Sequence, residues 1–197
     1  MNDDINDPFV FLEIAKNLEG WDTEDGHNLM ANAPGIVEMH SKDIPYTLPI
    51  LEGLEAILSL PDIPIEFAAT VESTVSTVFQ ELFTPEIVFD PSLNEFAVHL
   101  IRFYDTVLSL DSSLILAHPM SIAVALKIFD LIPNPDIERL IECSFQFIKK
   151  VIKICLYIPQ FQCDWLQYIK SVLGSAKNTY LSNQILCLFD EDRNTPN

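Results

Sequence analysis

The segment PIEFAATVESTVSTVFQELF, residues 64–83, indicates most clearly which fold the chain adopts. Its apolar residues recur three and four positions apart, which places them on one face of an α-helix. That face holds Phe67, Ala68, Val71, Val75, Val78, Phe79 and Leu82. The opposite face carries Glu66, Thr70, Ser73, Thr77 and Glu81. The segment therefore predicts an amphipathic helix that covers a hydrophobic core with one side.

The same periodicity predicts further helices along the chain, and no segment outside them alternates convincingly at the period of two that marks a strand. These helices are expected at residues 9–18, 49–60, 92–110, 119–131, 136–158, 163–173 and 178–189. Three of them follow Asp7-Pro8, Asp90-Pro91 and Asn134-Pro135. Asp and Asn cap exposed first-turn amides, and proline is tolerated at the first helical position. Gly174 is expected to end helix 163–173. The sequence therefore predicts an all-α fold.

Residues 20–46 differ from the rest of the chain. They combine three glycines and two prolines with five acidic residues and two histidines. Such a composition is typical of a long polar loop. The expected organisation is a short N-terminal helix at 1–19, an acidic loop at 20–46, a helical domain at 47–190 and a polar tail at 191–197.

The prolines that begin helices suggest an internal repeat. Pro49, Pro91 and Pro135 are 42 and 44 residues apart. Aligning Pro91 with Pro135 pairs Phe103 with Phe147 and also matches several other apolar positions. With this period and helix pattern the chain resembles the armadillo and HEAT family, whose repeats run about 40 to 47 residues. The resemblance covers roughly residues 45–190.

The resemblance implies a short right-handed α-solenoid of about three units. A compact helical bundle is the alternative architecture. In armadillo proteins that bind peptides, a tryptophan followed four residues later by asparagine lines the groove. Here Trp165 is followed four residues later by Ile169. The resemblance therefore does not extend to peptide binding of the nuclear-import type.

Charge is distributed unevenly along the chain, which has a formal net charge of −18. Residues 1–90 contain 18 acidic residues but only Lys16 and Lys42 as basic ones, whereas residues 91–197 contain 11 acidic and nine basic residues. An acidic surface repels phosphate backbones and anionic lipids. The sequence therefore predicts no nucleic-acid or membrane binding and favours a basic protein partner.

The sequence contains no recognisable catalytic or metal-binding motif, so we expect no catalytic residue, cofactor or metal site. The cysteines Cys143, Cys155, Cys163 and Cys187 lack metal-ligand spacing and are expected to be small core residues in a reducing compartment. Among the histidines, His99 has Glu95 and Arg102 at helical spacing, which predicts a salt-bridged surface. We interpret His27 and His40 as parts of the acidic loop, and His118 as a structural residue at a helix break.

No apolar run reaches the length of a membrane-spanning helix, because the nearest one, at 145–158, is interrupted by three lysines. The N-terminal residues lack the basic start of a secretory signal. These features predict a cytoplasmic or nuclear protein of eukaryotic type.

The sequence thus favours a non-enzymatic scaffold that binds basic segments through its acidic N-terminal half. The candidate binding residues are Asp22, Glu24, Asp25, Glu38 and Asp43, together with Lys149, Lys150 and Lys153. The lysines would contact an acidic partner or the acidic loop of the same chain. Two alternatives stay open: the acidic half only keeps the protein in solution, or the chain is an enzyme with a dispersed site that uses His27 or His118.

Overall fold

The computed structural model describes residues 5–79, 91–117, 119–127, 129, 135–157, 164–176 and 179–191. Within these ranges the chain forms ten α-helices and a short 3-10 helix, without a strand. The predicted all-α class is therefore confirmed. The chain divides into two compact units, residues 1–121 (unit 1) and residues 122–197 (unit 2). This division falls inside the single helical domain that the sequence predicted at 47–190.

The first helix, α1 (Pro8–Asn17), begins at the predicted cap. The Oδ1 atom of Asp7 accepts hydrogen bonds from the backbone N–H of Phe9 at 2.8 Å and of Val10 at 3.3 Å. Pro8 occupies the first turn of α1. Backbone amides in a first turn have no helical carbonyl to bind, so the N–H that proline lacks costs the helix no hydrogen bond. Local chemistry alone therefore sets the start of α1.

The second helix, α2 (Glu24–His40), occupies most of the region predicted as a loop, so that prediction is wrong. Thr23 caps the helix through its Oγ1 atom, which accepts from Gly26 N–H at 3.0 Å. Pro34 lies inside α2 and removes one helical hydrogen bond. Burial of an apolar face outweighs this loss, because each large side chain removed from water contributes about 1.5–3 kcal/mol. The large or branched side chains of this face are Leu29, Ile36 and Val37.

The third helix, α3 (Ile44–Leu58), begins earlier than the sequence predicted. Pro45 lies in its first turn, and Pro49, the predicted start, lies inside the helix. Helix starts therefore fall at residues 44, 91 and 135, and the first spacing is 47 residues rather than 42. The prediction failed because Pro45 and Pro49 both lie near this helix start, and only Pro45 lies in the first turn.

The fourth helix, α4 (Ile65–Phe79), follows the amphipathic pattern of the segment at 64–83. Its buried face includes Phe67, Val71, Val75 and Phe79, whereas Val78 is half-buried. Residues 80–83, the end of the predicted helix, lie outside the described residues.

Two more helices complete the main body of unit 1, α5 (Pro91–Leu110) and α6 (Ser112–Ala117). The Asp111 Oδ1 atom accepts from Ser113 N–H at 2.8 Å and so caps α6. Helix α5 begins at the predicted Pro91, while its expected cap Asp90 lies outside the described residues.

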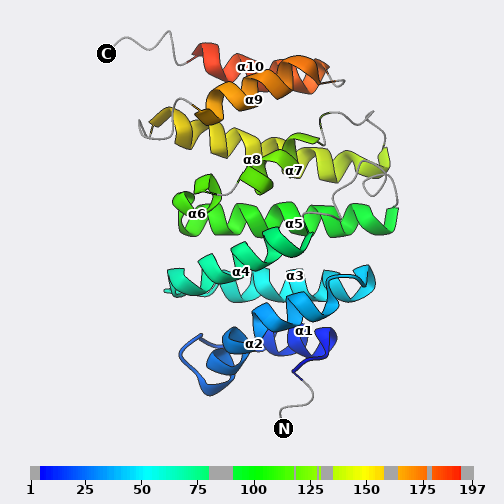
Figure 1. Cartoon of the computed structure of the whole chain (residues 1–197), viewed down its shortest axis with the longest axis vertical. Helices are drawn as coiled ribbons and strands as arrows, with labels where there is room; N and C mark the ends of the chain where they lie inside the picture. The colour runs from blue at the N-terminus through cyan, green and yellow to red at the C-terminus, as the bar shows by residue number, and fades with distance from the viewer. Residues whose placement is uncertain are drawn as a thin grey trace. The chain divides into compact units, whose positions relative to one another are not determined.

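The helices of unit 1 pack in two rows (Figure 1). In one row α1 packs against α3, and α3 packs against α5; in the other, α2 packs against α4. Helix α4 also contacts α5. Large buried side chains from both rows form the core: Phe11, Leu29, Ile36, Ile50, Leu51, Leu54, Phe79, Phe96, Phe103 and Tyr104.

Unit 2 begins within α7 (Pro119–Lys127) and continues through the 3-10 helix η3 (Pro135–Ile137) into α8 (Glu138–Tyr157). Helices α9 (Asp164–Ser175) and α10 (Thr179–Glu191) pack against each other and against α8 (Figure 1). Gly174 lies inside α9 and has no positive φ angle, so its prediction as a helix stop is wrong. Asn134, most of the polar tail and residues 158–163 lie outside the described residues.

The apolar faces of unit 2 follow the helical period. On α8 the buried positions are Leu140, Ser144, Phe147, Ile148, Val151, Ile152 and Cys155. Ile169 of α9 and Ile185 of α10 are also fully buried. Among the residues that the structure describes, no helix combines the length and the apolar character required to cross a bilayer.

Candidate interaction surface

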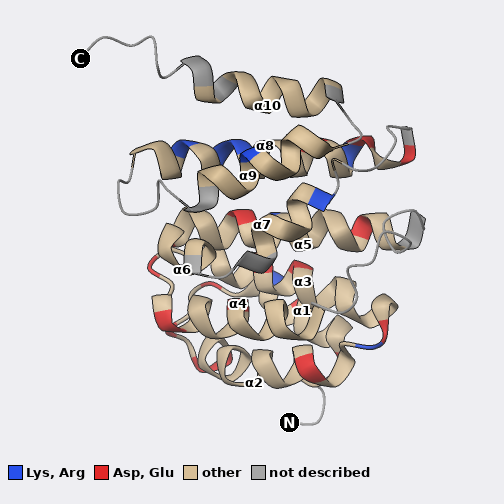
Figure 2. Ribbon diagram, turned by 45° about the horizontal axis from the view of Figure 1, so that its top comes forward, with Lys and Arg blue, Asp and Glu red and all other residues tan. Residues whose placement is uncertain are grey.

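The net charge of the protein belongs to unit 1. Residues 1–121 contain 21 acidic residues and three basic ones, Lys16, Lys42 and Arg102, for a net of −18. Residues 122–197 contain eight acidic and eight basic residues and are formally neutral. In Figure 2 the ribbon is red at acidic residues on the helices of unit 1 and blue at lysines along α8. The sequence already indicated this asymmetry of charge. When the chain is divided at residue 121, as the structure divides it, the whole net charge falls in unit 1.

The predicted acidic binding residues all lie exposed around α2 rather than in a loop. Asp22, Glu24 and Asp25 lie at its N-terminal end, Glu38 lies near its C-terminal end, and Asp43 precedes α3. Glu24 and Asp25 are in the first turn, where a carboxylate also stabilises the helix dipole.

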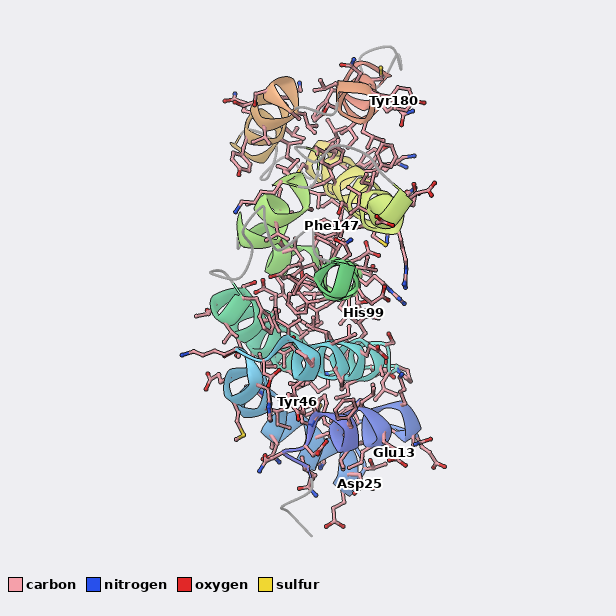
Figure 3. All side chains as sticks on the ribbon, turned by 90° about the vertical axis from the view of Figure 1, so that its right-hand side faces the viewer. Glu13, Asp25, Tyr46, His99, Phe147 and Tyr180 are labelled. Carbon is pink, nitrogen blue, oxygen red and sulfur yellow. The ribbon has the colours of Figure 1, made fainter. Side chains whose placement is uncertain are left out.

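Other exposed carboxylates enlarge this acidic surface. Figure 3 shows Glu13 of α1 and Asp25 of α2, which both project away from the ribbon. The exposed acidic side chains described in unit 1 are Asp7, Glu13, Glu19, Asp22, Glu24, Asp25, Glu38, Asp43, Asp62 and Glu66.

The predicted lysines belong to the other unit. Lys150 and Lys153 are exposed on α8, and Lys149 is half-buried there. The expectation that these lysines contact an acidic loop of the same chain assumed that residues 20–46 form a loop. Most of those residues form helix α2 instead, and its apolar face is buried within unit 1.

A polar cluster joins α1, α3 and α5 of unit 1 around His99, which Figure 3 labels on α5. The Nδ1 atom of His99 lies 2.8 Å from Oε1 of Glu55 on α3. Its Nε2 atom lies 3.4 Å from Oε1 of Glu95 and 3.9 Å from Oε1 of Glu52. With 8% of its surface exposed, His99 is a buried residue and not the surface residue that the sequence predicted.

Two of the three basic residues of unit 1 belong to this His99 cluster. The Nε atom of Arg102 lies 3.4 Å from Oε2 of Glu55. The Nζ atom of Lys16 on α1 lies 2.9 Å from Oε2 of Glu52. The sequence indicated a salt-bridged site from the helical spacing of Glu95, His99 and Arg102. It did not indicate Lys16, Glu52 or Glu55, because their contacts with α5 or α3 span 36 or more residues.

The His99 cluster borders an open pocket of about 330 Å³, lined by Lys16, Glu52, Glu55, Ala56, Ser59, His99 and Arg102. Each carboxylate of the cluster already faces a cation or the imidazole ring. Across the described part of the chain, no three His, Cys, Asp or Glu side chains are grouped as metal ligands. The His99 cluster therefore links α1, α3 and α5 through polar contacts.

A second polar chain lies buried between α4 and α5. The Ser76 hydroxyl donates to Oε1 of Glu72 at 2.8 Å, and Ser76 Oγ lies 3.0 Å from the Tyr104 hydroxyl. Because Ser76 has a single proton to donate, Tyr104 must be the donor to Ser76. Burial raises the pKa of Tyr104 far above its usual value, and the charge of Glu72 adds to this rise.

The remaining histidines and cysteines have different environments. His27 is exposed, with its ring centroid 6.0 Å from that of Trp21, and His118 lies outside the described residues. Cys155 is buried, as predicted, and burial raises its pKa to about 11. Cys143 is half-buried and Cys187 is exposed, so the prediction of a core position is wrong for Cys187. Cys163 is outside the described ranges.

No family model, no curated protein and no solved structure matches the chain.

Proposed function

We propose that this protein is a non-enzymatic interaction module whose acidic unit 1 binds a Lys- or Arg-rich segment of a protein partner. The observation that carries the proposal is the separation of charge: unit 1 has a net charge of −18 and unit 2 is neutral. A charged surface of one sign attracts oppositely charged partners and raises their association rate. The exposed carboxylates around α1 and α2 are available for such contacts.

The same charge argues for a protein partner rather than nucleic acid or membrane. Phosphate backbones and anionic lipids would both be repelled by unit 1. Two of the three cations of unit 1 are already paired with carboxylates in the His99 cluster. We propose a cytoplasmic or nuclear location for the protein.

For the architecture, we propose a short right-handed α-solenoid of the armadillo or HEAT type. The two rows in unit 1 support it, because α1, α3 and α5 follow one another on one side while α2 and α4 pair on the other. Stacked helix pairs of this kind present an extended binding surface. The helix starts at residues 44, 91 and 135 are compatible with repeats of about 40 to 47 residues.

The binding proposal is tested by titrating the full chain into a fluorescent peptide of alternating Lys and Ser. Raising the salt from about 0.1 M to about 1 M shortens the Debye length from about 10 Å to about 3 Å. We expect the affinity to fall steeply over this range. A peptide of alternating Glu and Ser should not bind. Affinity that is unchanged by salt would show that charge does not drive binding.

Matched neutralising variants locate the binding charge. The triple variant Asp22→Asn, Glu38→Gln, Asp43→Asn removes exposed carboxylates from around α2 and leaves those of its first turn intact. The control variant Asp136→Asn, Glu138→Gln, Glu142→Gln makes the same charge change in unit 2. We expect weaker peptide binding in the first variant only. Equal loss in both would contradict a specific role for unit 1. Absence of peptide binding to the wild type would favour a purely solubilising role for its charge.

A further inference from the structure

Three aromatic rings from three different helices meet at one place on unit 1. Phe9 comes from the start of α1, His40 from the end of α2, and Tyr46 from the first turn of α3. The ring centroids of Phe9 and Tyr46 are 6.0 Å apart in an edge-to-face arrangement. Those of His40 and Tyr46 are 5.6 Å apart, with 37° between the ring planes. We call these three residues the aromatic cluster.

The aromatic cluster is held in place yet open to solvent. The Nε2 atom of His40 lies 3.0 Å from the backbone oxygen of Asn6, which ties the end of α2 to the residues before α1. Even so, Phe9 is 56% exposed and Tyr46 is 40% exposed. The neighbouring Met39 is 63% exposed. Exposed aromatic surface that is fixed by its neighbours costs little conformational entropy when a partner binds.

Acidic residues lie close in sequence to each member of the aromatic cluster. Asp7 and Asp43 lie two and three residues before Phe9 and Tyr46, and both are exposed. The Asp43 side chain makes no capping hydrogen bond to α3, so its carboxylate is not engaged there. Glu38 is exposed near the end of α2, where the helix dipole also contributes negative potential. Against these three carboxylates, the adjacent stretch supplies one cation, Lys42.

We propose that the aromatic cluster is the docking site for an arginine or lysine side chain of the basic partner segment. The faces of aromatic rings attract cations, and a guanidinium group also stacks on them. The exposed carboxylates of Asp7, Glu38 and Asp43, which lie near these residues in the sequence, complement the same charge. This inference rests on the proposed function and names the part of unit 1 that anchors the partner. A planar guanidinium fits ring faces better than an ammonium, so an arginine-rich segment binds more tightly than a lysine-rich one.

The occupant is a protein segment and not a lipid surface. Exposed Phe, Tyr and Met side chains are also found where proteins insert into a membrane interface. Anionic lipid headgroups, however, would be repelled by Asp7, Glu38 and Asp43. Charge complementarity therefore selects the basic segment.

The test uses the full chain and a fluorescent peptide of alternating Arg and Ser. The double variant Phe9→Leu, Tyr46→Leu keeps apolar bulk at both positions and removes both rings. We expect its affinity for the peptide to fall about tenfold, the size that two partly exposed cation–π contacts produce together. The variant Tyr46→Phe keeps a ring and should bind like the wild type. The matched control is Tyr180→Leu, because Tyr180 is 71% exposed on α10 of the neutral unit 2 (Figure 3).

Thermal unfolding of each variant ensures that a loss of binding does not reflect a loss of fold. If the wild type binds in a salt-dependent way and the Leu double variant binds equally well, the docking site is wrong and the proposed function stands. If the wild type binds no basic peptide, the proposed function fails, and the docking site fails with it. Binding to phosphatidylserine vesicles that is lost in the double variant would assign the aromatic cluster to a membrane and overturn the inference.

Discussion

Gly53 of α3 lies directly against the ring of Phe11 of α1. A Cβ atom at residue 53 would stand 2.6 Å from Cε1 and 2.8 Å from Cδ1 of Phe11. Phe11 is fully buried, so its ring cannot swing out into solvent to make room. The absence of a side chain at residue 53 therefore sets how closely α1 and α3 approach.

Replacement of this glycine should destabilise unit 1. We expect Gly53→Ala to lower the free energy of unfolding by about 1–3 kcal/mol, the usual cost of overpacking a core. Urea denaturation followed by circular dichroism measures the change. The matched control is Gly35→Ala in α2, where an added Cβ would meet nothing within 4 Å. That variant should gain about 0.5–1 kcal/mol from helix propensity. A neutral Gly53→Ala would contradict the close approach.

The contact between Glu55 and His99 should contribute more to stability than the other ion pairs of the His99 cluster. Glu55 is the carboxylate closest to the imidazole and also pairs with Arg102. We expect Glu55→Ala to cost about 1–3 kcal/mol, because it leaves the buried His99 Nδ1 without its partner on α3. Glu95 is more exposed, and Glu95→Ala should cost about 0.5 kcal/mol or less.

A double-mutant cycle of Glu55→Ala with His99→Ala isolates this contact. Residues in direct contact show coupling energies of about 0.5–3 kcal/mol. Chemical denaturation of the four proteins gives the value. A coupling energy near zero would mean that the cluster fills space without joining α3 to α5.

The buried tyrosine should make unit 1 less stable in alkali. Burial raises the pKa of Tyr104, whereas an unfolded tyrosine ionises near pH 10. The stabilising effect of the protonated hydroxyl is thus complete below about pH 10 and is lost as the pH rises towards the folded pKa. Below pH 10, Tyr104→Phe should cost about 1 kcal/mol through the lost hydrogen bond to Ser76.

Above about pH 10 the two proteins should therefore converge in stability, because Tyr104→Phe removes the group that ionises on unfolding. Thermal unfolding between about pH 8 and about pH 11 follows this difference. A constant gap across the range would show that the Tyr104 hydroxyl ionises equally in the folded and unfolded states.

The described cysteines should differ sharply in their reactivity with thiol reagents. Cys187 is exposed on α10, whereas Cys155 is buried in α8 and its pKa is raised to about 11. Since the thiolate is the reactive species, Cys155 should be protected at pH 8 until the protein unfolds. Alkylation with iodoacetamide followed by peptide mass spectrometry measures both rates, and Cys187→Ser identifies the fast site. Equal rates would contradict the burial of Cys155.

Features set by neighbouring residues were predictable from the sequence. The all-α class follows from apolar residues spaced three and four apart, as in 64–83. The cap at Asp7 and the cap at Asp111 depend on side chains two or three residues from the amides they bind. The charge asymmetry was also visible, because charge is a property of the residues themselves.

The sequence was misleading wherever distant burial outweighs local preference. Pro34 and Gly35 disfavour a helix, yet α2 forms because its apolar face packs against α3 and α4. The same holds for Pro49 inside α3, where the residues around it are buried. Proline costs a helical hydrogen bond, but a buried apolar face contributes more than that loss.

The same distinction between local spacing and distant packing applies to the two candidate sites. Helical spacing predicted that Glu95, His99 and Arg102 are neighbours, but only the packing of α1 and α3 against α5 brings Lys16, Glu52 and Glu55 to the imidazole. The aromatic cluster likewise joins the ends of three helices. The sequence by itself determined the helical class and the sign of the charge, because both depend on residue type and short spacing. The tertiary structure decided that Lys16 meets Glu52, that His99 meets Glu55 and that Phe9 meets Tyr46, because each of these contacts joins residues more than 30 positions apart in the chain.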